Sequence, residues 1–203
     1  NVAAWSFSED GRSWEVRAIE DVAIGEEVRI CYGEMATAEI LAVHGMILAE
    51  NEADYLEIFE SGEDLLAAVE TLSQQPRCQR LGLLEAALSP DDVLLRPTLR
   101  ASEPLLRALE VSLCEDEELP KTVPLEGEAL LPVCSKDRER GLRLQALLFL
   151  TQLLRGGLRA MEDMPEASIS EGPEDLASRY RNHVKEMLTQ IISSAEAEMS
   201  LDL

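Results

Sequence analysis

A tyrosine followed by a glycine ends a short alternating segment, and this pair is the first candidate for chemistry. Val28, Ile30 and Tyr32 share one face at the period of two that strands have, which predicts a third short strand ending at Tyr32 with its ring inward. A phenol hydroxyl donates or accepts hydrogen bonds while neutral, because its reference pKa is about 10. Gly33 allows a positive φ directly after the strand. Taken alone, Tyr32 is more typical of an ordinary strand residue in a half-buried sheet.

Four other side chains have a possible chemical use. His44 could act as a general base because histidine titrates near neutrality, but no Ser, Cys or Asp is spaced around it as a triad requires. A structural role is therefore preferred for His44, and Met46 is expected to fill an irregular gap in the core. Trp5 and Trp14 could rim a lysine-binding groove through cation–π contacts worth about 0.5 to 2 kcal/mol. Packing of the two tryptophans against each other across a hairpin is the preferred interpretation.

The elements that must position these residues begin with a β-hairpin. Trp14, Val16 and Ala18 alternate with Arg17, and the turn signal Glu-Asp-Gly at residues 9–11 precedes them. A second turn is predicted at residues 24–25, before the third strand. The first 30 residues thus read as β structure.

After Tyr32 the apolar spacing changes to that of helices. A short helix is predicted over residues 38–46, with Gly45 near its end. Amphipathic helices follow, with leucine stripes that indicate buried faces. Residues 115–131 are expected to form a long acidic loop, and no fixed-period repeat indicates a solenoid. The fold class predicted is α+β, a short β part followed by an all-α helical bundle, with the later helices over residues 63–72, 78–88, 104–113, 137–161 and 173–199.

Charge and composition restrict the partners. The chain of 203 residues carries a formal net charge of -22, which argues against nucleic acid as a direct partner because phosphate binding needs clustered Lys and Arg. A basic protein surface is a better candidate, although surplus acid that only keeps the chain soluble is the simpler explanation. No apolar run approaches the roughly 20 residues of a bilayer span, so no membrane role is expected. Nothing in the sequence indicates an oligomeric state.

Cysteine usage and the first residues bear on the compartment. The four cysteines form no Cys-x-x-Cys pair, so neither a metal site nor a disulfide framework is predicted, and a reducing compartment is the simplest assumption. An intracellular location, cytoplasmic or nuclear, is expected, with an organelle such as the chloroplast left open. The first residue is Asn1 rather than Met, and no signal peptide pattern follows, so the chain is interpreted as N-terminally truncated.

Two motifs resemble the end of a SET methyltransferase domain. Residues 23–33 read Ala-Ile-Gly-Glu-Glu-Val-Arg-Ile-Cys-Tyr-Gly, similar to the Gly-Glu-Glu turn and the strand ending in Tyr-Gly that carries the catalytic tyrosine of that family. Twelve residues downstream, residues 44–46 with Asn51 and Asp54 look like the family's Tyr-Gly-Phe segment and its trailing asparagine and acid before the next strand. The spacing agrees, but His44 and Met46 depart from the family's aromatic residues.

The remainder resembles the helical domain of SET enzymes of the Rubisco large subunit methyltransferase type. Residues 104–109 are similar to its Leu-Arg core helix, residues 135–139 to its Ser-x-x-Asn-Glu helix start, and residues 179–188 to its Arg-x-x-Glu-Lys-x-x-Leu ending. The resemblance implies a SET segment over residues 1–60 and a substrate-binding helical domain over residues 61–203.

The resemblance also implies an activity. A protein-lysine methyltransferase uses S-adenosylmethionine, and the catalytic role falls on Tyr32, whose hydroxyl would orient the acceptor amine. Tyr32 and Asn1 are the expected cofactor contacts, and Gly33, His44 and Met46 the expected substrate contacts, with no metal. The family's other cofactor segments are absent here, so activity would belong to a longer parent chain, and histidine could replace lysine as acceptor. The alternative is a non-catalytic SET-derived scaffold that binds a basic protein.

Overall fold

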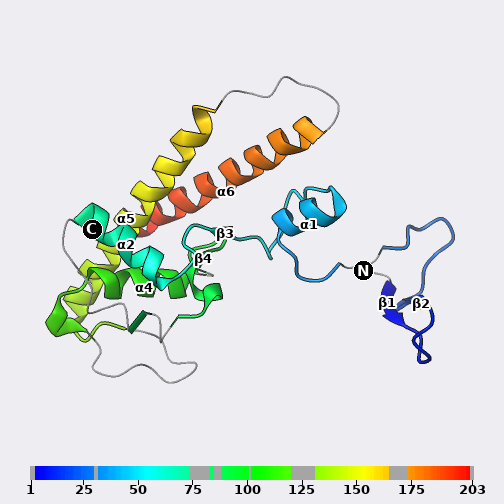
Figure 1. Ribbon diagram of the computed structural model, residues 1–203, viewed down its shortest axis with the longest axis horizontal. Coiled ribbons are helices and arrows are strands. Elements are labelled where there is room, and N and C mark those ends of the chain that lie inside the picture. Colours follow the sequence, from blue (N-terminus) through cyan, green and yellow to red (C-terminus); the bar gives the residue numbers. More distant parts are fainter. Residues whose placement is uncertain are drawn as a thin grey trace. The chain divides into compact units, whose positions relative to one another are not determined.

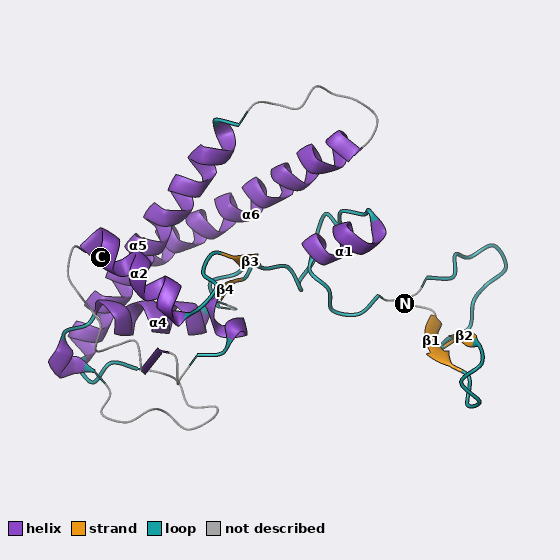
Figure 2. Cartoon of the chain, viewed as in Figure 1, coloured by secondary structure: helices purple, strands orange, loops and turns teal. Residues whose placement is uncertain are grey.

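The fold is α+β, and its strands are few and short beside its helices (Figure 2). The computed structural model describes residues 3–29, 32–73, 83–84, 88–100, 102–119, 131–164 and 173–201. Two compact units divide the chain, Asn1–Met35 and Ala36–Leu203. The domain division at residue 60, which the family resemblance implies, stays a prediction.

The first unit is built on an antiparallel hairpin of β1 (Ala3–Phe7) and β2 (Trp14–Ala18). The predicted hairpin is therefore confirmed. Its register places Trp5 opposite Val16 and Phe7 opposite Trp14. The rings of Phe7 and Trp14, which this register places opposite each other, lie with centroids 3.9 Å apart. The predicted packing of Trp5 against Trp14 stays a prediction.

The hairpin loop is closed by its own polar groups. The Ser8 N–H donates to the Ser13 carbonyl over 2.8 Å, and Gly11 has a φ of 66°, which favours glycine. The Asp10 carboxylate accepts from the Ser8 hydroxyl at 2.6 Å and from the Arg12 N–H at 3.1 Å. The hydrogen bond from Ser8 in particular holds the pKa of Asp10 below its usual value. The predicted turn signal therefore has a physical basis.

The second turn is also present, but the third strand is not confirmed. Gly25 has a φ of 87°, and the Glu26 N–H donates to the Ala23 carbonyl over 3.0 Å. Val28 and Tyr32 lie outside any strand, and Ile30 is not among the described residues. The Ala3 N–H of β1 donates to the Arg29 carbonyl over 3.2 Å, so the segment does contact the hairpin, but a strand needs a ladder of such bonds.

The second unit begins with a short helix and ends with two long ones. Its small sheet pairs two strands of two residues each, with Leu56 opposite Leu95. Part of the region predicted as all-α therefore contributes a strand. In chain order the elements are α1 (Thr37–His44), β3 (Leu56–Glu57), α2 (Gly62–Ser73), the 3-10 turn η2 (Pro90–Val93), β4 (Leu94–Leu95), α4 (Glu103–Leu113), the 3-10 turn η3 (Asp116–Glu118), α5 (Lys136–Glu162) and α6 (Pro173–Leu201).

The predicted helices agree with the observed ones within one or two residues at the ends that are described. Of the helix predicted over residues 78–88, only residues 83–84 are described as helical, and most of the rest lies outside the described residues. The predicted long loop contains η3, and residues 120–130 of it are likewise outside. No described helix combines the length and the hydropathy that crossing a bilayer demands.

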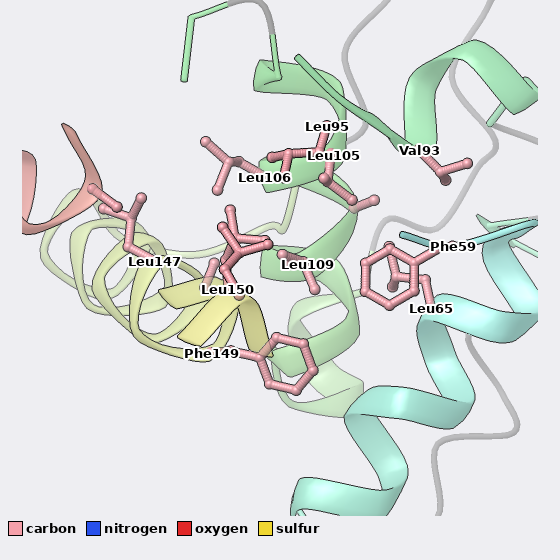
Figure 3. Packing of buried hydrophobic residues seen from close by; sticks show 14 of the residues in the cluster. Phe59, Leu65, Val93, Leu95, Leu105, Leu106, Leu109, Leu147, Phe149 and Leu150 are labelled. Atoms are coloured by element: carbon pink, nitrogen blue, oxygen red, sulfur yellow. The ribbon is translucent and has the colours of Figure 1, made fainter. Parts of the chain in front are cut away.

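The core of the second unit lies where α4 meets its neighbours. α4 packs against α5 on one side and α2 on the other, and α5 and α6 run in opposite directions against each other (Figure 1). Leu105, Leu106 and Leu109 on α4 are fully buried, with Leu147 and Leu150 of α5 beside them (Figure 3). Their spacing of three and four residues is the stripe read from the sequence.

A buried ion network ties three helices together beside this core. Glu110 on α4 has no exposed surface, and it accepts from Arg107 at 2.7 Å and from Arg143 of α5 at 3.3 Å. Arg143 also bonds Glu103 of α4 at 2.8 Å and Glu198 of α6 at 2.9 Å. Such a network fixes how α4, α5 and α6 pack, because a buried charge must be paired.

Candidate functional site

The tyrosine predicted to act in catalysis lies at the surface of the first unit. Tyr32 is 46% exposed, so its predicted inward orientation is wrong. Burial requires a covering layer, and within residues 3–29 and 32–35 the described side chains bury only Ala3. Gly33 has a φ of 93°, as expected, and a Cβ built there would meet no atom within 4 Å. Backbone conformation rather than space accounts for the glycine.

The predicted substrate contacts His44 and Met46 lie in the second unit, around the end of α1. His44 is the last residue of α1, and its side chain is exposed. Gly45 follows in the left-handed region with a φ of 67° and caps the helix through a bond from its N–H to the Leu41 carbonyl. Met46 is 39% exposed, so its predicted core role is wrong. Asn1 lies outside the described residues.

A different group of polar side chains converges on Asp54, which is only 4% exposed. Its Oδ1 accepts from the Thr37 N–H at 2.5 Å and from Asn51 Nδ2 at 3.1 Å. Its Oδ2 accepts from the Thr37 hydroxyl at 3.0 Å and lies 2.8 Å from Nε2 of His183. Because Thr37 is the first residue of α1, the carboxylate also sits at the positive end of that helix.

His183 joins this group from α6, 129 residues further along the chain. A carboxylate oxygen can only accept, so the contact requires the hydrogen on Nε2 of the imidazole. Tyr180, one turn earlier, stacks near His183 with ring centroids 6.3 Å apart. Burial, followed by the negative charge of Asp54, raises the pKa of the Tyr180 phenol. Sequence reasoning missed His183: residues 179–188 resemble a helix ending of the family, but that pattern gives no role to a histidine, and its partner Asp54 is remote in the sequence.

Asp54 and His183 line a pocket of about 530 Å³ and, with side chains only 5% and 13% exposed, form its buried floor. The turn at Asn51, the residues after β4 and one face of α6 enclose it. Three further acids line it, Glu50, Glu52 and Glu186, and none of its lining residues is Lys or Arg. The Asn51–Asp54 pair was noticed in the sequence as a motif, but the pocket above it depends on α6.

The chemistry open to this pocket is recognition of a polar or cationic group. The described residues contain no cluster of three or more His, Cys, Asp or Glu side chains arranged to hold a metal ion. The imidazole of His183 is oriented by Asp54, which resembles the acid–base pairs of enzymes, but the described side chains bring no Ser or Cys nucleophile to the pocket lining. Binding is therefore better supported than catalysis here.

The described residues do not by themselves fit S-adenosylmethionine. A nucleoside-containing cofactor needs an enclosing pocket, but Tyr32, the one described residue expected to touch it, belongs to a unit whose described side chains are almost all at least partly exposed. The pocket of the second unit is lined by none of the expected cofactor residues.

Comparison with known proteins gives no relative. No protein-family model matches the chain, and neither a curated protein nor a solved structure is significantly similar to it. The resemblance to SET enzymes therefore rests on the sequence motifs alone, chiefly residues 23–33 and residues 44–46 with Asn51 and Asp54.

Proposed function

We propose that this chain is the C-terminal part of a SET-type protein-lysine methyltransferase whose helical unit docks the protein substrate. The observation that carries the proposal is the first unit, a hairpin with exposed apolar side chains and a Tyr-Gly pair after a Gly-Glu-Glu turn. An isolated two-stranded hairpin is marginal in water, so these side chains call for further polypeptide to cover them. A preceding part of a SET domain would supply that layer.

The segment after α1 supports the same proposal. In the motif the asparagine and the acid come just before a strand, and here Asn51 and Asp54 precede β3 by a few residues. Both are engaged in the network on Asp54. A buried carboxylate with several donors is a specific arrangement, because its desolvation must be compensated.

In this proposal Tyr32 acts by positioning. Its hydroxyl would accept a hydrogen bond from the acceptor amine, and well-oriented reactants gain roughly 7 to 11 kcal/mol. S-adenosylmethionine would be the methyl donor, bound mainly by residues that precede Asn1 in the parent chain. The reducing, intracellular location expected from the cysteines, cytoplasmic or nuclear, belongs to the proposal as well.

Calorimetric titration of S-adenosylmethionine into the parent chain and into this 203-residue chain tests the proposal. Binding to the parent alone is the expected result. A Tyr32→Phe parent should keep cofactor binding and lose most methyl transfer, whereas Tyr55→Phe should change neither. Absence of binding to the folded parent would contradict the enzyme and favour the second candidate.

The second candidate is a non-catalytic scaffold that binds a basic protein. Favouring it are the exposed position of Tyr32 and the acidic lining of the pocket. Both candidates include docking of a protein by the helical unit, and they differ in methyl transfer.

A further inference from the structure

The pocket above Asp54 and His183 has a charge balance that selects for cations. Glu50, Glu52 and Glu186 line it and are exposed, and none of the three has an ion-pair partner among the residues that the structure describes. Elsewhere in the second unit several glutamates pair with arginines, as in the network of α4, α5 and α6. The pocket therefore presents uncompensated negative charge.

The walls of the pocket are suited to an aliphatic stem. Ala49, Pro97 and Met187 contribute to the lining, and Met187 is only 7% exposed. A methionine side chain adapts its shape to an unbranched hydrocarbon, because its thioether is flexible and polarisable. A lining that combines apolar side chains with acids complements a group with a methylene chain and a charged tip.

The floor gives the pocket a fixed shape. Asp54 is bonded to Thr37, Asn51 and His183, which belong to three separate segments of the chain. A site on such a fixed floor loses less entropy when it binds than one made of mobile side chains. The pocket thus combines a hydrogen-bonded floor at Asp54 with apolar lining residues and exposed acids.

We infer that this pocket binds a lysine or arginine side chain of a protein partner. The methylene stem lies against Met187 and Pro97, and the charged tip meets Glu50, Glu52 and Glu186. The inference rests on the docking of a protein by the helical unit, which both candidate functions share. It does not depend on methyl transfer.

NMR titration of the isotope-labelled 203-residue chain tests it with two matched tripeptides, Ac-Ala-Lys-Ala-NH2 and its norleucine analogue. Norleucine keeps the four-carbon stem and lacks the ammonium group. The lysine peptide should shift the amide signals of Thr98, Gln190 and Ala49, and added salt should weaken its binding. The norleucine peptide should bind much less, since charge recognition is lost.

Two triple variants separate the pocket from the general acidity of the chain. Glu50→Gln, Glu52→Gln and Glu186→Gln together should weaken binding of the lysine peptide about fivefold or more. The control combines Glu60→Gln, Glu117→Gln and Glu162→Gln, three glutamates that do not line the pocket, and should keep the wild-type affinity. Circular dichroism verifies that both variants fold, which is expected because none of the six positions is buried.

Each contrary outcome has a distinct meaning. Equal binding of the two peptides, equal loss in the two triple variants, or no shift of the pocket amides would overturn the inference. An equal affinity for n-butylamine, which has the stem and ammonium without peptide groups, would overturn it in favour of a free-amine site. Failure of the parent chain to bind S-adenosylmethionine would contradict the proposed methyltransferase function and would leave the inference about the pocket unaffected.

Discussion

At the level of single residues, the Asp54 carboxylate concentrates more donors than any other described side chain of the pocket. Thr37, Asn51 and His183 all reach it, and it is 4% exposed. An asparagine amide in its place could accept on one atom only, so one or more of these donors would lose its partner. A buried polar group without a hydrogen-bond partner destabilises the folded state, because its desolvation is not compensated.

Asp54→Asn should therefore lower the free energy of unfolding by about 2 to 3 kcal/mol, measured by urea denaturation. Asp91→Asn, at an exposed position of η2, is the control and should change it by less than about 0.5 kcal/mol. Similar losses in the two variants would mean that the network contributes nothing beyond surface charge.

Thr151 on α5, unlike Asp54, has a buried polar atom without a hydrogen-bond partner among the described residues. It is 1% exposed, and the atom concerned is its hydroxyl oxygen. Replacing an unsatisfied hydroxyl with a methyl group of the same shape removes a desolvation cost.

Thr151→Val should raise the melting temperature, with a gain of about 1 kcal/mol at the transition. Thr189→Val, at an exposed position whose hydroxyl donates to the Lys185 carbonyl at 2.7 Å, should give no gain. A destabilised Thr151→Val protein would indicate that the hydroxyl is bonded after all.

Glu118 supplies a pH-dependent contact between η3 and α5. Arg138 donates to it twice, from Nε at 2.7 Å and from Nη2 at 3.1 Å, and this bonding lowers the pKa of the Glu118 carboxyl below its ordinary value of 4.5. A lowered pKa in the folded state gives stability that is present above 4.5 and lost as the pH falls through the folded value.

Glu118→Gln should cost about 1 kcal/mol at pH 7 and almost nothing near pH 3, where the wild-type carboxyl is also becoming neutral. Denaturation curves at several pH values test this, with Glu117→Gln as the neighbouring control. A constant difference across the pH range would contradict an ionic origin.

At the level of elements, the decisive contact is Arg143, which connects α5 to both α4 and α6. Burial by itself lowers the pKa of its guanidinium, but the hydrogen bonds to Glu198 and Glu103 outweigh that effect and raise it. Burial also raises the pKa of Glu110, and its two arginine partners offset only part of this. Without Arg143, the buried Glu110 carboxylate would have Arg107 as its single ion-pair partner among the described residues.

Arg143→Met should destabilise the protein by about 3 kcal/mol, because a buried carboxylate loses a partner. The matched control is Arg155→Met on the same helix, whose pair with Glu196 is about half exposed and contributes at most about 1 kcal/mol. Comparable losses at the two positions in chemical denaturation would contradict the role of burial.

The elements themselves were largely predictable. Amphipathic spacing of apolar residues identified α2, α4, α5 and α6, with leucine stripes in α4 and α5, since period 3.6 follows from helix geometry alone. Ser135 caps α5, since its Oγ accepts from the Arg138 N–H at 3.3 Å, and serine is a residue type that favours this position. The third strand is not confirmed: Ile30 lies outside the described residues, and a hydrogen-bond ladder depends on a neighbouring edge, which no local pattern specifies.

At the level of the whole molecule, nearly all the apolar burial described belongs to the second unit. The core cluster runs from Phe59 to Ala195, whereas Ala3 is the one buried side chain described before Ala36. A unit that contains its own core can fold without the other.

Residues 36–203 expressed alone should keep the helical circular dichroism signal and melt within a few degrees of the whole chain. Residues 1–35 alone should show no cooperative transition, because a lone hairpin is marginally stable. Loss of helicity in the shorter chain would show that the first unit is needed for folding.

Local sequence was enough to establish the opening hairpin, the limits of the described helices to within one or two residues, the turns at Gly11 and Gly25, and the acidic character of the molecule. These follow from backbone geometry, from side-chain periodicity and from counting charges. Three-dimensional packing was needed to establish that Phe7 faces Trp14, that Tyr32 is exposed, and that His183 meets Asp54. Each of these features involves residues from different elements. How close such residues lie, and whether one covers another, depends on packing that no local pattern encodes.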